Sequence, residues 1–164
     1  MSNVIEAQPP KKAALPKIIE ASQISPDFLR DESRMEGRAG YAAFPINADE
    51  VSALMAWAKG KSLPVTVSGG RTGIAGGAVP EGGLLLSLTR LQKIGAVQQD
   101  SDGRPYVFSG AGVLLSELQN HLITKKSGLF FPPDPTETSA TIGGMIACNA
   151  SGAHTYSYGP TRKY

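Results

Sequence analysis

The stretch that decides the fold reads Val65-Thr66-Val67-Ser68-Gly69-Gly70-Arg71-Thr72-Gly73-Ile74-Ala75-Gly76-Gly77. A short run typical of a buried strand leads directly into a glycine-rich loop. Consecutive backbone N–H groups in such a loop can bind an anion, and the missing Cβ atoms let a phosphate approach closely, which suits a diphosphate. The loop lacks the Gly-Lys-Ser/Thr ending of a P-loop, and its glycines do not follow the G-x-G-x-x-G spacing of dinucleotide-binding folds. Alone, the segment is as typical of a wide turn as of a binding loop.

A second segment of small residues runs from Thr141 to Gly152, shortly after the proline-rich sequence Pro132-Pro133-Asp134-Pro135. Ser139 and Thr141 offer hydroxyl groups to ribityl or phosphate oxygens. Gly143 and Gly144 would let the backbone approach a flat ring. Without the first motif, this segment indicates a packing site for small residues as readily as a ligand site.

The sequence around these motifs alternates between helix and strand patterns, which predicts an α/β or an α+β domain. A capping-box spacing at Asn47 and Glu50 predicts a helix that closes at Gly60. A second helix is expected over 114–123, and Ser25-Pro26-Asp27 suggests a helix start. Strands are expected over 63–67, 84–88 and 106–108, and residues 31–43 are expected to form a loop.

Composition narrows the function classes. The chain has 164 residues and a net charge of +2, so charge does not favour nucleic acid or a membrane surface. It has no apolar run long enough to cross a membrane and no apolar signal core, which predicts an intracellular, cytoplasmic protein. The single cysteine excludes an internal disulfide and a multi-cysteine metal site, and no metal is expected. Most of the 19 glycines lie between Gly69 and Gly152.

Several side chains that could take part in catalysis or binding also have an ordinary structural interpretation. His121 is expected to face solvent on its helix, and His154 to lie in a surface loop. Cys148 is expected to be a buried, inert thiol, and Trp57 to pack in the core. Arg71 is expected either to pair with a phosphate oxygen or to form a surface salt bridge.

Taken together, in this order and spacing, the two motifs resemble the PCMH-type FAD-binding domain of the vanillyl-alcohol-oxidase-type flavoproteins. The branch with the glycolate oxidase large subunit and FAD-linked D-lactate dehydrogenase is the most similar. The resemblance runs from about Tyr41 to Tyr164. Besides the two motifs it includes Phe44-Pro45, Asp49-Glu50-Val51, Val79-Pro80, Leu86-Ser87-Leu88, Gly110-Ala111-Gly112-Val113 and Tyr158-Gly159.

The resemblance implies an α+β fold of two subdomains with FAD between them. It divides the chain into a flexible tail (1–16), a first FAD-binding subdomain (17–140) and the start of a second subdomain (141–164) that is cut short. The implied FAD contacts are Ser68, Gly69, Gly70, Arg71, Thr72, Gly73, Ile74, Pro133, Asp134, Ser139, Ala140, Thr141, Gly143, Gly144, Asn149, Ala150, Ser151 and Gly152. In relatives with covalent FAD a histidine follows the two loop glycines, so Arg71 predicts non-covalent FAD.

The resemblance also implies an activity, the oxidation of a 2-hydroxy acid of the glycolate or D-lactate type to a 2-oxo acid. The family's catalytic base lies in a part that this sequence does not contain, so no catalytic residue is assigned and the chain alone is expected to be inactive. Two alternatives stay open: a flavin-binding module that self-associates or needs a partner chain, and an inactive fragment. In the complete enzyme, attachment to the periphery of the inner membrane is an alternative to a purely cytoplasmic location.

Overall fold

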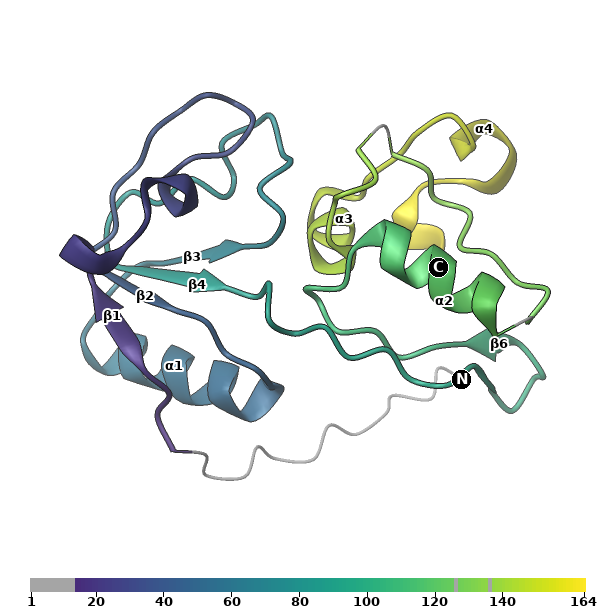
Figure 1. Ribbon diagram of the computed structural model, residues 1–164, viewed down its shortest axis with the longest axis horizontal. Coiled ribbons are helices and arrows are strands. Elements are labelled where there is room, and N and C mark those ends of the chain that lie inside the picture. The colour runs from purple at the N-terminus through teal and green to yellow at the C-terminus, as the bar shows by residue number, and fades with distance from the viewer. Residues whose placement is uncertain (1–13, 126, 136) are drawn as a thin grey trace.

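A four-stranded sheet organises the first half of the computed structural model, which describes residues 14–125, 127–135 and 137–164 (Figure 1). Its strands are β1 (Ile18–Glu20), β2 (Tyr41–Ala43), β3 (Val65–Ser68) and β4 (Leu84–Ser87), in the order β1-β2-β4-β3. Strands β2 and β3 both pair in parallel with β4, and β1 pairs antiparallel with β2. Most of the expected tail over 1–16 lies outside the described residues.

Strand β4 is buried along its whole length, because both faces of the sheet are covered. Leu84 and Leu86 pack on one face against helix α1 (Ala48–Gly60). Leu85 points to the opposite face and packs with Ile24 and the other residues of a second cluster. This alternation follows from the two-residue period of a strand. It confirms the strands expected at 63–67 and 84–88, with small shifts at their ends.

Helix α1 begins as the capping pattern predicts. The Asn47 side chain accepts a hydrogen bond from the Glu50 N–H (2.8 Å), and the Glu50 carboxylate accepts one from the Ile46 N–H (2.9 Å). The helix ends at Gly60, as expected. Trp57 packs beside the core in an edge-to-face contact with Tyr41 (5.2 Å between ring centroids), which confirms its structural role.

The N-terminal third differs from the expectation. Strand β2 lies inside residues 31–43, which were expected to form a loop, and the pattern gave no sign of β1. The helix start at Ser25-Pro26-Asp27 leads only into a 3-10 turn, η2 (Pro26–Leu29), after a similar turn η1 (Ala21–Gln23). Strands of three residues are too short to show a periodic pattern, so the pairing of β2 with β4 and of β1 with β2 decides their structure.

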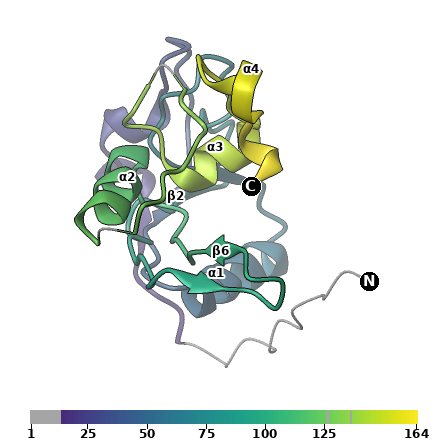
Figure 2. The same ribbon diagram turned by 90° about the vertical axis from the view of Figure 1, so that its right-hand side faces the viewer.

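The second half of the chain forms a lobe of its own. It contains a short antiparallel hairpin, β5 (Gln98–Gln99) and β6 (Pro105–Tyr106), and helices α2 (Leu115–Thr124), α3 (Ile142–Cys148) and α4 (Thr155–Tyr158), followed by the 3-10 turn η3 (Thr161–Lys163). Figure 2 shows α2 and α3 above this hairpin. The strand expected over 106–108 is wrong in extent, because β6 ends at Tyr106, pairing resumes only as an isolated bridge between Ile94 and Ser109, and Phe108 is largely exposed.

Helix α3 was not expected from its glycine-rich sequence, yet it supplies part of the hydrophobic core of the second lobe. Ile142 and Met145 are buried together with Val113, Leu118 and Leu122. Residues on both sides of position 140 therefore share one cluster, and the division of the chain at that position stays a prediction. Within the described residues, no helix is long and apolar enough to span a membrane.

Candidate functional site

The two glycine-rich segments meet in space. In Figure 1 the loop that leaves β3 faces α3 across the gap between the lobes. A Cβ atom added at Gly69 would overlap the Thr141 hydroxyl, and one added at Gly70 would lie 2.9 Å from the Ser139 carbonyl oxygen. Glycine is required at both positions for this close approach. The fold therefore brings together residues that the sequence only suggested as partners.

The loop presents backbone donors without protein acceptors. Among the described residues, no N–H group of residues 69–75 donates a hydrogen bond to another protein atom. Ser68, at the end of β3, is fully buried, and its Oγ has no hydrogen-bond partner in the described part of the chain. Buried or half-buried polar groups require partners, so water or a ligand must supply them here. A polyanion such as a diphosphate fits this set of donors.

The second segment differs, because its N–H groups are already used. Gly143 donates to the Ala111 carbonyl (2.9 Å), and Gly144 donates to the Thr141 Oγ1 (3.3 Å). A Cβ added at Gly143 would lie 2.7 Å from the Ala111 Cβ. Gly143 thus serves close packing, and Thr141 caps the start of α3. Of the two interpretations of this segment, packing holds for Gly143.

Ser139 is held by a neighbouring carboxylate. Its hydroxyl and its N–H both donate to the Glu137 Oε1, at 2.7 and 3.0 Å. The hydrogen bond from the hydroxyl and then the one from the backbone lower the pKa of the Glu137 carboxyl below its usual 4.5. The Ser139 hydroxyl, expected to reach a ligand, is therefore engaged within the protein. Ala140 is buried in the hydrophobic core of the second lobe.

The remaining expected contacts line the segments that flank α3. Asn149 ends the helix in a left-handed conformation (φ 48°), and its Oδ1 accepts a hydrogen bond from the Arg162 N–H (3.0 Å). The Ala150 carbonyl oxygen accepts two hydrogen bonds, one from the Thr161 N–H (3.0 Å) and one from the Thr161 hydroxyl (2.7 Å). Ser151 is exposed. These bonds tie the end of α3 to η3.

The proline-rich segment packs against the next turn. Pro133 is fully buried, and Gly152 lies so close to the Asp134 carbonyl that a Cβ could not fit. The Asp134 carboxylate lies 3.6 Å from the His154 Nδ1, with both side chains about half exposed. His154 is exposed, as expected for a surface loop, and its partner is one of the predicted site residues.

The Arg71 side chain contacts an aromatic ring and a backbone carbonyl. Its guanidinium lies 4.5 Å above the Phe28 ring, and its Nη1 lies 3.5 Å from the Gly69 carbonyl. Arg71 belongs to none of the ion pairs formed by the described residues, so the expectation of a surface salt bridge is wrong within this part of the chain. Its backbone is in the left-handed region (φ 59°). The pairing with phosphate stays a prediction.

Two further expectations need correction. Cys148 is exposed at the last position of α3, whereas Ile142 and Met145 of the same helix are buried. His121 is half-buried rather than solvent-facing, since it flanks the buried Leu118 on α2. Its Nε2 is buried and has no hydrogen-bond partner among the described residues.

The loop also contacts residues that no sequence motif identifies. Phe28 contacts Arg71, and the Glu32 N–H donates to the Arg71 carbonyl (3.2 Å). Met35 packs against Gly76. Neither spacing nor composition singles these residues out, because they lie in the segment that pairs with the loop only after folding.

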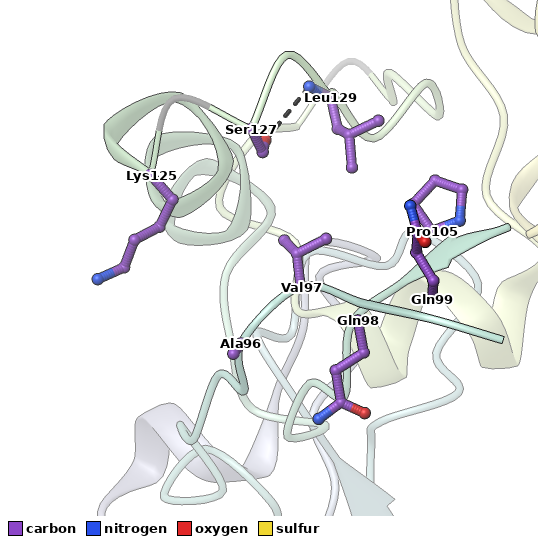
Figure 3. Close-up of a pocket in the computed structure, with 8 residues that line it drawn as sticks. All are labelled: Ala96, Val97, Gln98, Gln99, Pro105, Lys125, Ser127 and Leu129. Atoms are coloured by element: carbon purple, nitrogen blue, oxygen red, sulfur yellow. Dashed lines mark hydrogen bonds between the residues drawn. The ribbon is translucent and has the colours of Figure 1, made fainter. Parts of the chain in front are cut away.

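A cavity lies away from this site. It has a volume of about 760 Å³ and lies between the β5–β6 hairpin and the end of α2 (Figure 3). Its lining residues are Ala96, Val97, Gln98, Gln99, Pro105, Lys125, Ser127 and Leu129. None of the predicted FAD contacts belongs to this set.

Comparison with known proteins identifies the family. Residues 39–164 match the family model described as an FAD binding domain. The chain is 37% identical to a D-lactate dehydrogenase of Anaerostipes hadrus over 157 residues (94% of this chain, 32% of that protein), and 45% identical to one of Archaeoglobus fulgidus over 121 residues (73% and 26%). It thus spans a third or less of the length of these relatives.

A solved structure shows the same fold at lower sequence identity. The 6-hydroxy-D-nicotine oxidase of Arthrobacter nicotinovorans superposes with a TM-score of 0.72 at 20% identity, over 92% of this chain and 32% of that one. The mixed sheet and helices therefore confirm the expected α+β class. With the glycine loop packed against α3 and the family match over most of its length, the chain belongs to the FAD binding domain family and its cofactor is FAD.

Proposed function

We propose that this chain binds FAD without a covalent bond and holds the FAD diphosphate on residues 68–74. The observation that carries the proposal is the row of N–H groups at residues 69–75, which have no acceptor among the described residues. Two further features support it. Ser68 offers a buried hydroxyl that has no partner among the residues that the structure describes, and Gly69 and Gly70 bring the loop against Thr141 and Ser139.

We further propose that the complete protein is a flavin-dependent oxidoreductase that converts a 2-hydroxy acid to a 2-oxo acid. The support is the similarity to proteins named D-lactate dehydrogenase. When bound, FAD supplies an isoalloxazine ring that accepts a hydride. The residues of this chain bind and orient the diphosphate, and the second segment braces the loop through Thr141. A cytoplasmic location, with peripheral attachment to the inner membrane as the alternative, is part of this proposal and is tested by cell fractionation.

Non-covalent binding is proposed because Arg71 stands where covalent relatives have a histidine. Intact mass under denaturing conditions is the measurement. The expected result is the mass of the polypeptide alone, with free FAD released into solution. A flavin adduct on the chain would contradict the proposal.

Direct titration of the chain with FAD tests the binding loop. Gly73→Ala is the informative variant, because a Cβ there meets no protein atom within 4 Å and the fold should be unaffected. If the diphosphate rests on this loop, the added methyl weakens FAD binding about tenfold, equivalent to about 1.4 kcal/mol. Gly77→Ala is the matched control, because its Cβ also meets nothing and it lies outside the predicted contacts. Equal affinity for both variants would contradict the loop assignment.

A second candidate is a module that reaches full FAD affinity only with a partner chain or a second copy. Large apolar side chains at both sides of the site favour it, since Ile74 is 81% exposed and Ile146 is 65% exposed. Sedimentation velocity with and without FAD tests self-association. A monomer that binds FAD tightly would exclude a need for another chain.

A further inference from the structure

Residues 28–35 contact the glycine-rich loop at two separate points. This segment precedes residues 39–164, the part that matches the family model. It begins within the turn η2 and continues through the bend after it, and its Phe28 and Leu29 pack beside the sheet on the face opposite α1.

The first point of contact is Arg71. Its guanidinium lies 4.5 Å above the ring of Phe28, which is fixed edge-to-face on Phe44 with 5.0 Å between centroids. The Glu32 N–H donates to the Arg71 carbonyl oxygen at 3.2 Å. Arg71 has a φ of 59°, a conformation that residues with a Cβ rarely adopt. The stacking and the hydrogen bond together hold that conformation.

The second point is Gly76, where φ is 73°. A Cβ added there would lie 2.9 Å from the Met35 Sδ and 3.8 Å from the Ser33 Oγ. Ser33 is itself fixed, because the buried Asp31 accepts hydrogen bonds from its N–H and its hydroxyl. Residues 72–75 therefore lie between two positions, Arg71 and Gly76, that closely approach residues 28–35.

We propose that residues 28–35 act as a clasp that presets the glycine-rich loop for the FAD diphosphate. Phe28 and Arg71 are positioning residues in this arrangement, and the Arg71 side chain acts through Phe28 instead of through a phosphate oxygen. The inference rests on the proposed function of the loop. Preorganised donors bind a ligand more tightly because less conformational freedom is lost on binding.

A double-mutant cycle tests the clasp through FAD affinity. Phe28→Leu and Arg71→Met are each expected to weaken FAD binding about tenfold, and the double variant is expected to be no weaker than either single one. Phe28→Tyr keeps the ring face and should restore the affinity of the unmodified chain. Additive losses would overturn the proposal, because they would mean that Arg71 contacts the cofactor independently of Phe28. An unchanged affinity in Phe28→Leu would overturn it as well.

Limited trypsin digestion in the absence of FAD tests the clasp without the proposed function. In Phe28→Leu, cleavage after Arg71 should become faster, whereas cleavage after the exposed Lys61, at the end of α1, should keep its rate and serve as the internal reference. An unchanged rate after Arg71 would overturn the clasp even if FAD binds. Failure of the unmodified chain to bind FAD, together with faster cleavage in the variant, would instead refute only the proposed function of the loop.

Discussion

Residues 69–75 and residues 141–145 are both short and rich in glycine, and they lie against each other, but their backbone N–H groups have different partners. In the first segment no N–H donates to another described residue, whereas Gly143 and Gly144 in the second donate to Ala111 and Thr141. One segment keeps donors available for a ligand, and the other uses glycine to pack a helix tightly. Similar composition thus serves two purposes, and hydrogen bonds tell them apart.

The largest effect is expected from Gly143→Ala. The new methyl would meet the Ala111 Cβ at 2.7 Å and the Ala111 carbonyl oxygen at 2.9 Å, so α3 must move. We expect the free energy of unfolding to fall by about 1–3 kcal/mol, measured by urea denaturation. Gly144→Ala is the control. Its Cβ would lie 3.1 Å from the Thr141 Oγ1 alone, and the gain in helix propensity of up to about 1 kcal/mol offsets that contact. Equal losses for both would mean that Ala111 does not set the helix position.

The next effect is expected at the other end of α3. Asn149 adopts φ 48° and accepts a hydrogen bond from the Arg162 N–H. Asn149→Ala should destabilise the chain by about 1–2 kcal/mol, because alanine is strained in the left-handed region and the hydrogen bond is lost. Asn149→Gly keeps the backbone conformation and should lose less, as thermal unfolding would show. A larger loss of stability in Asn149→Gly than in Asn149→Ala would show that the left-handed conformation is not the cause.

A smaller effect is expected from the cap of α3. The Thr141 Oγ1 accepts from the Gly144 N–H (3.3 Å), and Thr141→Val removes this acceptor with little change of shape. The expected loss is about 1 kcal/mol in the free energy of unfolding. Thr141→Ser retains the acceptor and should remain close to the unmodified chain. A loss in serine as large as in valine would assign the effect to packing against Gly69 instead of to the cap.

The smallest effect concerns pH. Hydrogen bonds from Ser139 lower the pKa of the exposed Glu137 carboxyl below its usual 4.5. The folded state therefore binds this proton less readily than the unfolded state, so the stabilisation is present above the ordinary pKa and is lost as the pH falls through the lowered one. The difference in stability between the unmodified chain and Glu137→Gln should shrink as the solution is acidified below 4.5. A difference that is constant over this range would show that the carboxylate is not the cause.

Local patterns along the chain specify several elements of this protein. Asn47 and Glu50 specified the start of α1, and the apolar run over 84–88 specified a buried strand, because capping and hydrophobic runs are local signals. The order of the two glycine-rich motifs was enough to indicate the FAD-binding family. Their residue types could not show which glycines bind and which pack, since that depends on atoms far away in the chain.

Tertiary structure alone decided the rest. Strands β1 and β2 are only three residues long and exist because they extend the pairing of β4. Helix α3 forms in spite of its two glycines, because Ile142 and Met145 complete a core that α2 begins. Phe28 meets Arg71 only once the sheet has placed η2 beside the loop. Contacts between distant segments carry no local pattern, so only the folded chain reveals which residues shape the binding loop.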